Sequence, residues 1–319
     1  MLLAAQFSPA PTVLPEFASA TAISATTPKL QDETNHDPDP QFPVWNDGEP
    51  EDGPAEAPLT NADTFKLHSN PGSNHTIFLD LDGGITEGTA WNNSTGIETL
   101  IDIAYTRNSD SSTFSNSELS EIRSIWKLVA EDFAPFDVNV TTEDPGLDAL
   151  TRSGSGDTTW GIRSLHTTNT NKVCGGCGGV AYIGSFSSSI DLPAYSFNKG
   201  VNAGGNTQSH EVGHAVRLGH DGLSSGTTYY GGHGSGNTTW GPIMGGPGSR
   251  KLKTWSNGDY YNANNQQDDL DRISTLNGFS FRSDDHGNTF AVATPLQIES
   301  TQNFSAFGII EQNNDVDLF

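Results

Sequence analysis

Three histidines and a glutamate lie close together in residues 209–221, whose sequence is SHEVGHAVRLGHD. Two histidines four positions apart on a helix share one face, so His210 and His214 can bind one metal ion. Glu211 follows the first of them, where its carboxylate can reach a water on the metal instead of the metal itself. His220 can supply a third imidazole if the helix ends before it and the chain turns back. The spacing therefore predicts a metal site with a general base beside it.

The residues around this segment restrict the kind of metal site. A structural zinc site is usually closed by four protein ligands, whereas a catalytic site keeps one position open. No cysteine lies near the segment, which favours the open, catalytic arrangement. A downstream glutamate cannot be the third ligand, because none occurs between Glu211 and Glu299. The remaining candidates for the third ligand are His220, Asp221, Asp259 and Asp268.

The pattern resembles that of the metzincin zinc metalloproteases, specifically the secreted bacterial reprolysin-like type. His220 is the tenth residue after His210, as the metzincin motif requires of its third ligand. Met244, the only methionine besides Met1, lies 24 residues after His220 in the sequence PIMG and matches the metzincin Met-turn. In this family the turn forms a hydrophobic floor beneath the three imidazoles. The resemblance covers about residues 70 to 280.

This resemblance implies a zinc-dependent endopeptidase that acts on proteins or peptides. His210, His214 and His220 would hold Zn²⁺, and Glu211 would act as the general base toward the attacking water. In the family, the backbone of a strand at the sheet edge pairs with the substrate. The residues that correspond to that strand are Gly179, Val180, Ala181 and Tyr182.

Arg217 departs from the metzincin motif, which has glycine at this position. Glycine is favoured where a chain leaves a helix with a positive φ, and another residue there costs about 1 to 2 kcal/mol. Such a cost could displace His220, unless Gly219 takes over the reversal. The alternative function is therefore a secreted binding or adhesion module with a degenerate, catalytically silent zinc site.

Further residues are candidates for smaller roles. His233 lies on a glycine-rich loop between the third ligand and the Met-turn, where it could line a substrate subsite. Cys174 and Cys177 are the only cysteines, and we expect a local disulfide because no second pair would complete a metal knuckle. Ca²⁺ is a second candidate cofactor, although no EF-hand pattern is present. Its candidate ligands are Asp80, Asp82, Asp284, Asp285, Asp315 and Asp317.

The composition restricts the class of partner. The 319 residues include 15 Lys and Arg against 39 Asp and Glu, which gives a formal net charge of −24. Nucleic acid is an unsuitable partner, because phosphate binding depends on a basic surface. No apolar run approaches the roughly 18 residues of a membrane span. We expect a secreted monomer whose N-terminus lacks a visible export signal and is incomplete.

Hydrophobic periodicity predicts an α+β fold. Strands are expected over residues 76–82, 137–142, 159–167 and 179–183, with order beginning at the first of them. A capping box at Ser115 and Glu118 begins a long helix that Pro135 ends. The metzincin resemblance implies a twisted mixed sheet with this long backing helix, an active-site helix and a small C-terminal subdomain that includes a helix over residues 264–276.

The chain divides into three parts by composition. Residues 1–69 form an acidic, proline-rich prosegment or linker that we expect to be largely disordered, since residues 30–65 hold ten acids, no Lys or Arg and too little apolar surface to bury. Residues 70–282 form the metzincin-like domain. Residues 283–319 are β-rich and resemble the truncated start of a bacterial pre-peptidase C-terminal domain, a β-sandwich.

Overall fold

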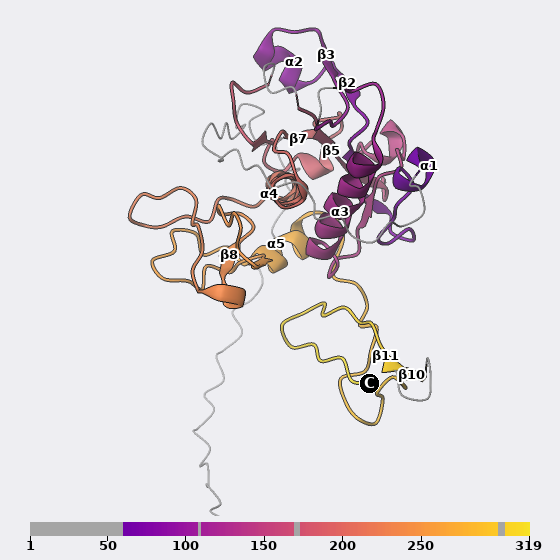
Figure 1. Ribbon diagram of the computed structural model, residues 1–319, viewed down its shortest axis with the longest axis vertical. Coiled ribbons are helices and arrows are strands. Elements are labelled where there is room, and N and C mark those ends of the chain that lie inside the picture. The colour runs from indigo at the N-terminus through magenta and orange to yellow at the C-terminus, as the bar shows by residue number, and fades with distance from the viewer. Residues whose placement is uncertain (1–59, 108–109, 169–172, 299–303) are drawn as a thin grey trace, which may run out of the picture. The chain divides into compact units, whose positions relative to one another are not determined.

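The computed structural model describes residues 60–107, 110–168, 173–298 and 304–319 (Figure 1). Most of the expected prosegment lies outside these residues. The chain is already ordered before the first strand, contrary to expectation: α1 (Asn61–Thr64) is capped by Thr60. Leu67 then exchanges two hydrogen bonds with Thr142, at 3.0 and 3.1 Å. Residues 60–69 therefore pack against the body of the fold.

The central sheet has five strands in the order β4-β1-β5-β7-β6. They are β1 (His75–Asp80), β4 (Asn139–Thr141), β5 (Trp160–His166), β6 (Gly179–Val180) and β7 (Ala194–Ser196). β1 pairs in parallel with β4 and β5, and β5 pairs in parallel with β7. β6 runs antiparallel to β7 and forms one edge. The sequence analysis missed β7, because three residues are too few to show alternation.

Two long helices pack against one face of this sheet and against each other (Figure 1). In α3 (Asn116–Asp132), Ser115 and Glu118 form the predicted capping box, and the helix ends before Pro135 as expected. α4 (Val201–Ala215) carries two of the three predicted metal ligands, His210 and His214. The buried side chains shared by the sheet and these helices include Ile77, Leu79, Ile122, Ile125, Val129, Val140, Ile162 and Val212.

A segment inserted between β1 and α3 was not predicted from the sequence. It contains β2 (Gly84–Glu87), α2 (Ala90–Thr95) and β3 (Thr99–Asp102), and β2 pairs antiparallel with β3. Trp91 and Leu100 from this segment share a second buried cluster with Leu165 of β5. Because side chains alternate along a strand, Leu165 and Ile162 point to opposite faces of the sheet. The inserted segment thus packs on the face away from α3 and α4.

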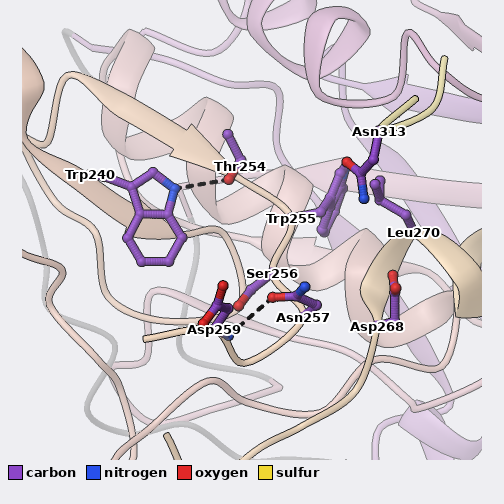
Figure 2. A pocket seen from close by; sticks show the side chains of 9 residues that line it. All are labelled: Trp240, Thr254, Trp255, Ser256, Asn257, Asp259, Asp268, Leu270 and Asn313. Atoms are coloured by element: carbon purple, nitrogen blue, oxygen red, sulfur yellow. Dashed lines mark hydrogen bonds between the residues drawn. The ribbon is translucent and has the colours of Figure 1, made fainter. Parts of the chain in front are cut away.

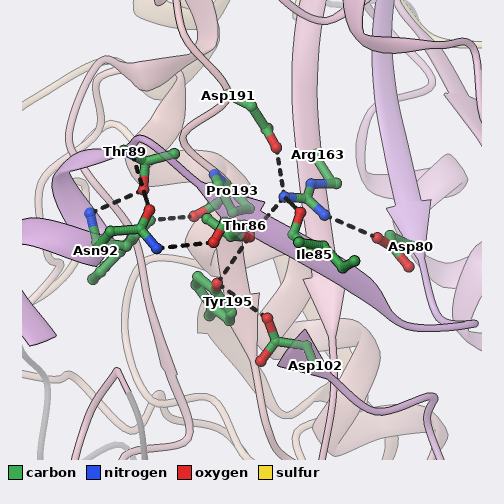
Figure 3. A network of polar contacts seen from close by, with 11 residues as sticks. Asp80, Ile85, Thr86, Thr89, Asn92, Asp102, Arg163, Asp191, Pro193 and Tyr195 are labelled. Atoms are coloured by element: carbon green, nitrogen blue, oxygen red, sulfur yellow. Dashed lines mark hydrogen bonds and ion pairs between the residues drawn. The ribbon is translucent and has the colours of Figure 1, made fainter. Parts of the chain in front are cut away.

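Arg163 of β5 lies on this second face and joins the insertion to the sheet (Figure 3). The residue is 7% exposed, and its guanidinium donates to Thr86 Oγ1 at 2.7 Å and pairs with Asp80 and Asp191. Burial raises the pKa of Asp80 to about 7, although the charge of Arg163 opposes this shift. The network places one buried carboxylate, Asp80, and one partly buried carboxylate, Asp191, around one buried cation.

The chain after α4 forms short elements. They are β8 (Trp240–Pro242), β9 (Leu252–Thr254) and α5 (Asp269–Leu276). α5 begins five residues later than expected, and Asp268 caps it. The residues before it bond to the loop after α4 instead: Gln267 accepts a hydrogen bond from Gly219 N, and Asn264 N donates to Gly222 O. Residues 264–267 therefore hold the loop that follows α4. Single 3₁₀ turns lie at Leu147–Ala149, Ser185–Ser187 and Gly236–Thr238.

The described residues confirm an α+β fold with a mixed, mostly parallel sheet. Within the described part of residues 283–319 the strands are β10 (Gln297–Ile298) and β11 (Phe304–Ser305), an antiparallel pair of two residues each. Among the described residues, the helices are all too short or too polar to cross a bilayer.

Candidate metal centre

The three predicted histidines lie together at the C-terminal half of α4 and the loop after it. Their ligating nitrogens lie within 4.8 Å of one another, and His214 Nε2 is 2.9 Å from His220 Nε2. His210 and His214 are 1% and 2% exposed, whereas His220 is partly exposed. The arrangement brings three imidazoles to one point that is accessible from one side.

Backbone carbonyls orient two of these imidazoles. His210 Nδ1 donates to Ile243 O and His214 Nδ1 donates to Leu218 O, each at 2.9 Å. A carbonyl can only accept, so Nδ1 carries the hydrogen and Nε2 presents the lone pair, as in a metal-binding imidazole. Burial, with the charges of His214 and His220, lowers the pKa of His210 well below its usual value. This donor set fits a zinc ion with an open fourth position.

Arg217 makes the chain reversal that brings His220 back toward α4. Its φ is +79°, whereas Gly219 is not among the glycines with positive φ. Leu218 N donates to Gly213 O at 2.9 Å, which closes the end of the helix. Of the two positions considered for the reversal, the structure uses Arg217, and His220 nevertheless reaches the other imidazoles.

Arg217→Gly is expected to stabilise the fold by about 1 kcal/mol, since glycine adopts a positive φ without steric cost. Zinc affinity should stay the same or increase. Arg217→Ala is the matched control, because it also removes the guanidinium but keeps the backbone strain. Melting temperatures and zinc dissociation constants of both variants measure the effect. A glycine variant no more stable than the alanine variant would show that the positive φ costs nothing here.

Met244 lies directly beneath the helix that carries the ligands. It is fully buried, and a Cβ built on Gly213 would lie 2.4 Å from its sulfur. Its carbonyl accepts a hydrogen bond from Asp221 N at 2.8 Å. The residue before Met244, Ile243, accepts the hydrogen bond from His210 Nδ1. This turn therefore supports the helix and also orients one of the imidazoles.

Glu211 lies against the edge strand β6. Its side chain is 2% exposed, and a Cβ on Gly179 would lie 2.4 Å from Glu211 Oε1 and 2.6 Å from Thr207 Cγ2. β6 spans only two of the four residues suggested for substrate binding. Val180 and Tyr182 pack in the second buried cluster, so their side chains face the protein interior. Only glycine at position 179 leaves room for the carboxylate.

Gly179→Ala should displace the Glu211 carboxylate, because the new methyl group would overlap it. If the site is the hydrolytic one that the sequence predicts, we expect a loss of hydrolysis that approaches about 100-fold, the factor a general base contributes, and unchanged zinc content. Gly175→Ala is the control, since nothing lies within 4 Å of a Cβ there. Equal activities of the two alanine variants would contradict this placement of Glu211.

The other candidates occupy separate positions. His233 is exposed, and its Nδ1 lies 2.9 Å from Tyr230 Oη, on a loop paired with Trp240. Cys174 and Cys177 form a disulfide with each other. Asp259 and Asp268, considered as third ligands, line a pocket with Trp240 and Trp255 that includes none of the three histidines (Figure 2).

Tyr229 was missed by the sequence analysis. Its hydroxyl lies 3.4 Å from His220 Nε2. Two adjacent tyrosines in a loop rich in glycine, serine and threonine carry no periodic signal, so nothing in the sequence distinguished this residue.

No known protein family, curated protein or solved structure matches this chain.

Proposed function

We propose that this protein is a zinc-dependent endopeptidase of the metzincin type. The observation that supports it best is the convergence of His210, His214 and His220 beside the buried Glu211. A site that only held the fold together would not need a carboxylate at this position. Met244 beneath α4 and the antiparallel edge strand β6 agree with the same assignment.

The three imidazoles would hold the metal through their Nε2 atoms. A bound zinc ion lowers the pKa of a coordinated water and polarises a carbonyl group. Glu211 accepts the proton of the attacking water and delivers it to the leaving amine. β6 would hold an extended peptide through backbone hydrogen bonds beside Glu211, because its outer edge continues the sheet. The substrates are then proteins or peptides, and the protein acts as a secreted monomer.

A direct assay separates this function from a silent binding module. The full chain is incubated with an unlabelled protein mixture, and new N-termini are identified with and without a chelator. We expect cleavage that the chelator abolishes and that about one zinc per chain restores, as for a catalytic site. Zinc bound at that stoichiometry without any cleavage would instead establish the binding module.

The second proposed cofactor is Ca²⁺, held by residues near the C-terminus. Carboxylate oxygens of Asp284, Glu311 and Asp315 lie within 4.8 Å of one another. Glu311 is 3% exposed, and neither of its carboxylate oxygens has a hydrogen-bond partner among the described residues. Burial, with the neighbouring acids, raises the pKa of Glu311 to about 7. A hard cation with oxygen ligands would compensate these charges.

Calcium should therefore raise the melting temperature of the full chain, because it binds the folded state. Glu311→Gln should reduce this increase, whereas Glu98→Gln, on an exposed residue, should preserve it. The measurement is thermal unfolding of zinc-loaded protein in calcium, magnesium and neither. An equal increase for both variants would exclude this site.

A further inference from the structure

The phenol of Tyr229 lies at the mouth of the metal centre. Its hydroxyl is 3.4 Å from His220 Nε2, and the two ring centroids are 4.5 Å apart. The centroid of His210 is 6.2 Å away. Nε2 is the atom through which His220 would bind a metal, so the hydroxyl lies next to the reacting position.

Backbone hydrogen bonds fix this position. Tyr230 N donates to Asp221 O at 2.7 Å, and Gly246 N donates to Tyr230 O at 3.0 Å. Asp221 N in turn donates a hydrogen bond to Met244 O. Hydrogen bonds therefore connect the loop that carries Tyr229, Asp221 next to the third ligand, and the Met-turn. A Cβ on Gly246 would lie 3.3 Å from Tyr229 Cβ, and glycine there gives the tyrosine its space.

The next residue points elsewhere. Tyr230 Oη is 2.9 Å from His233 Nδ1, and its ring stacks on Tyr260 with centroids 4.5 Å apart. The two adjacent tyrosines therefore differ in orientation, and only the first faces the imidazoles. This difference provides a matched pair for an experiment.

We propose that Tyr229 is a catalytic residue that donates a hydrogen bond from its hydroxyl to the carbonyl oxygen of the scissile peptide. This inference rests on the proposed endopeptidase function. The carbonyl oxygen gains negative charge as water attacks, and a donor already in place stabilises that charge more than the neutral substrate. The phenol keeps its proton throughout. The proton of the water passes to Glu211 and then to the leaving amine.

The test compares Tyr229→Phe with Tyr230→Phe in the zinc-loaded full chain. For Tyr229→Phe we expect kcat to fall about 100-fold with KM nearly unchanged, as when one oxyanion donor is lost. A phosphinic peptide built on a cleaved sequence mimics the tetrahedral state, and we expect it to bind about tenfold more weakly by calorimetry. Zinc content and melting temperature should stay unchanged. Tyr230→Phe should preserve all five quantities: kcat, KM, affinity for the phosphinic peptide, zinc content and melting temperature.

Three results would overturn this role. An unchanged kcat in Tyr229→Phe would exclude the hydrogen bond from Tyr229 to the carbonyl oxygen. A variant that loses both its zinc and its activity would show that the tyrosine is a metal ligand. Equal weakening of substrate and phosphinic peptide shows ordinary binding. An inactive wild type that retains zinc is a different outcome, because it refutes the endopeptidase function itself.

Discussion

Glu211→Ala is expected to lower peptide hydrolysis at least about 100-fold while the protein retains its zinc, since a general base contributes about that factor. The structure places the carboxylate against Gly179, at the strand edge proposed to bind substrate. The alanine variant removes the proton acceptor but leaves His210 and His214 bonded to backbone carbonyls. Hydrolysis rate and zinc content are measured on the same preparations.

Two further variants make this result specific. Glu211→Gln keeps the shape of the side chain beneath β6 and should be as inactive as the alanine variant, because an amide is not a base. Glu131→Ala, which changes an exposed acid on α3, should retain full activity. If zinc is lost from both Glu211 variants, then Glu211 is a ligand and the assignment of the base is wrong.

Arg163→Met is expected to lower the free energy of unfolding by about 3 to 5 kcal/mol, as when one partner of a buried ion pair is removed. Asp80 would remain buried, and Asp191 partly buried, without the guanidinium that now contacts both. The link from β5 to the inserted segment through Thr86 would also be lost (Figure 3). Urea unfolding of the two proteins measures the difference.

The loss of unfolding free energy in Arg163→Met should depend on pH. The pKa of Asp80 is already raised to about 7 by burial, and removal of the neighbouring cation raises it further. A carboxyl with a raised pKa in the folded state destabilises the fold increasingly as pH rises from its unfolded pKa to its folded pKa. The variant should therefore lose less stability at pH 5 than at pH 8. The same loss at both values would show that packing, not charge, dominates.

The local pattern of the sequence determined the elements around the site. The capping box at Ser115 begins α3 as predicted, because its hydrogen bonds join residues three apart. The helical period likewise placed His210 and His214 on one face of α4 before any tertiary contact was known. Contacts over four residues or fewer depend little on the rest of the chain.

Only the tertiary structure decided which residues complete the site. The position of the reversal after α4 was ambiguous, and packing selects Arg217 over Gly219 despite the cost of its positive φ. Tyr229 reaches His220 because the Met-turn holds its loop, through hydrogen bonds between residues far apart in sequence. The short strand β7 exists only because β5 and β6 provide partners on either side. Such contacts depend on how segments far apart in the sequence pack together. Neither the spacing of residues nor their periodicity predicts that packing.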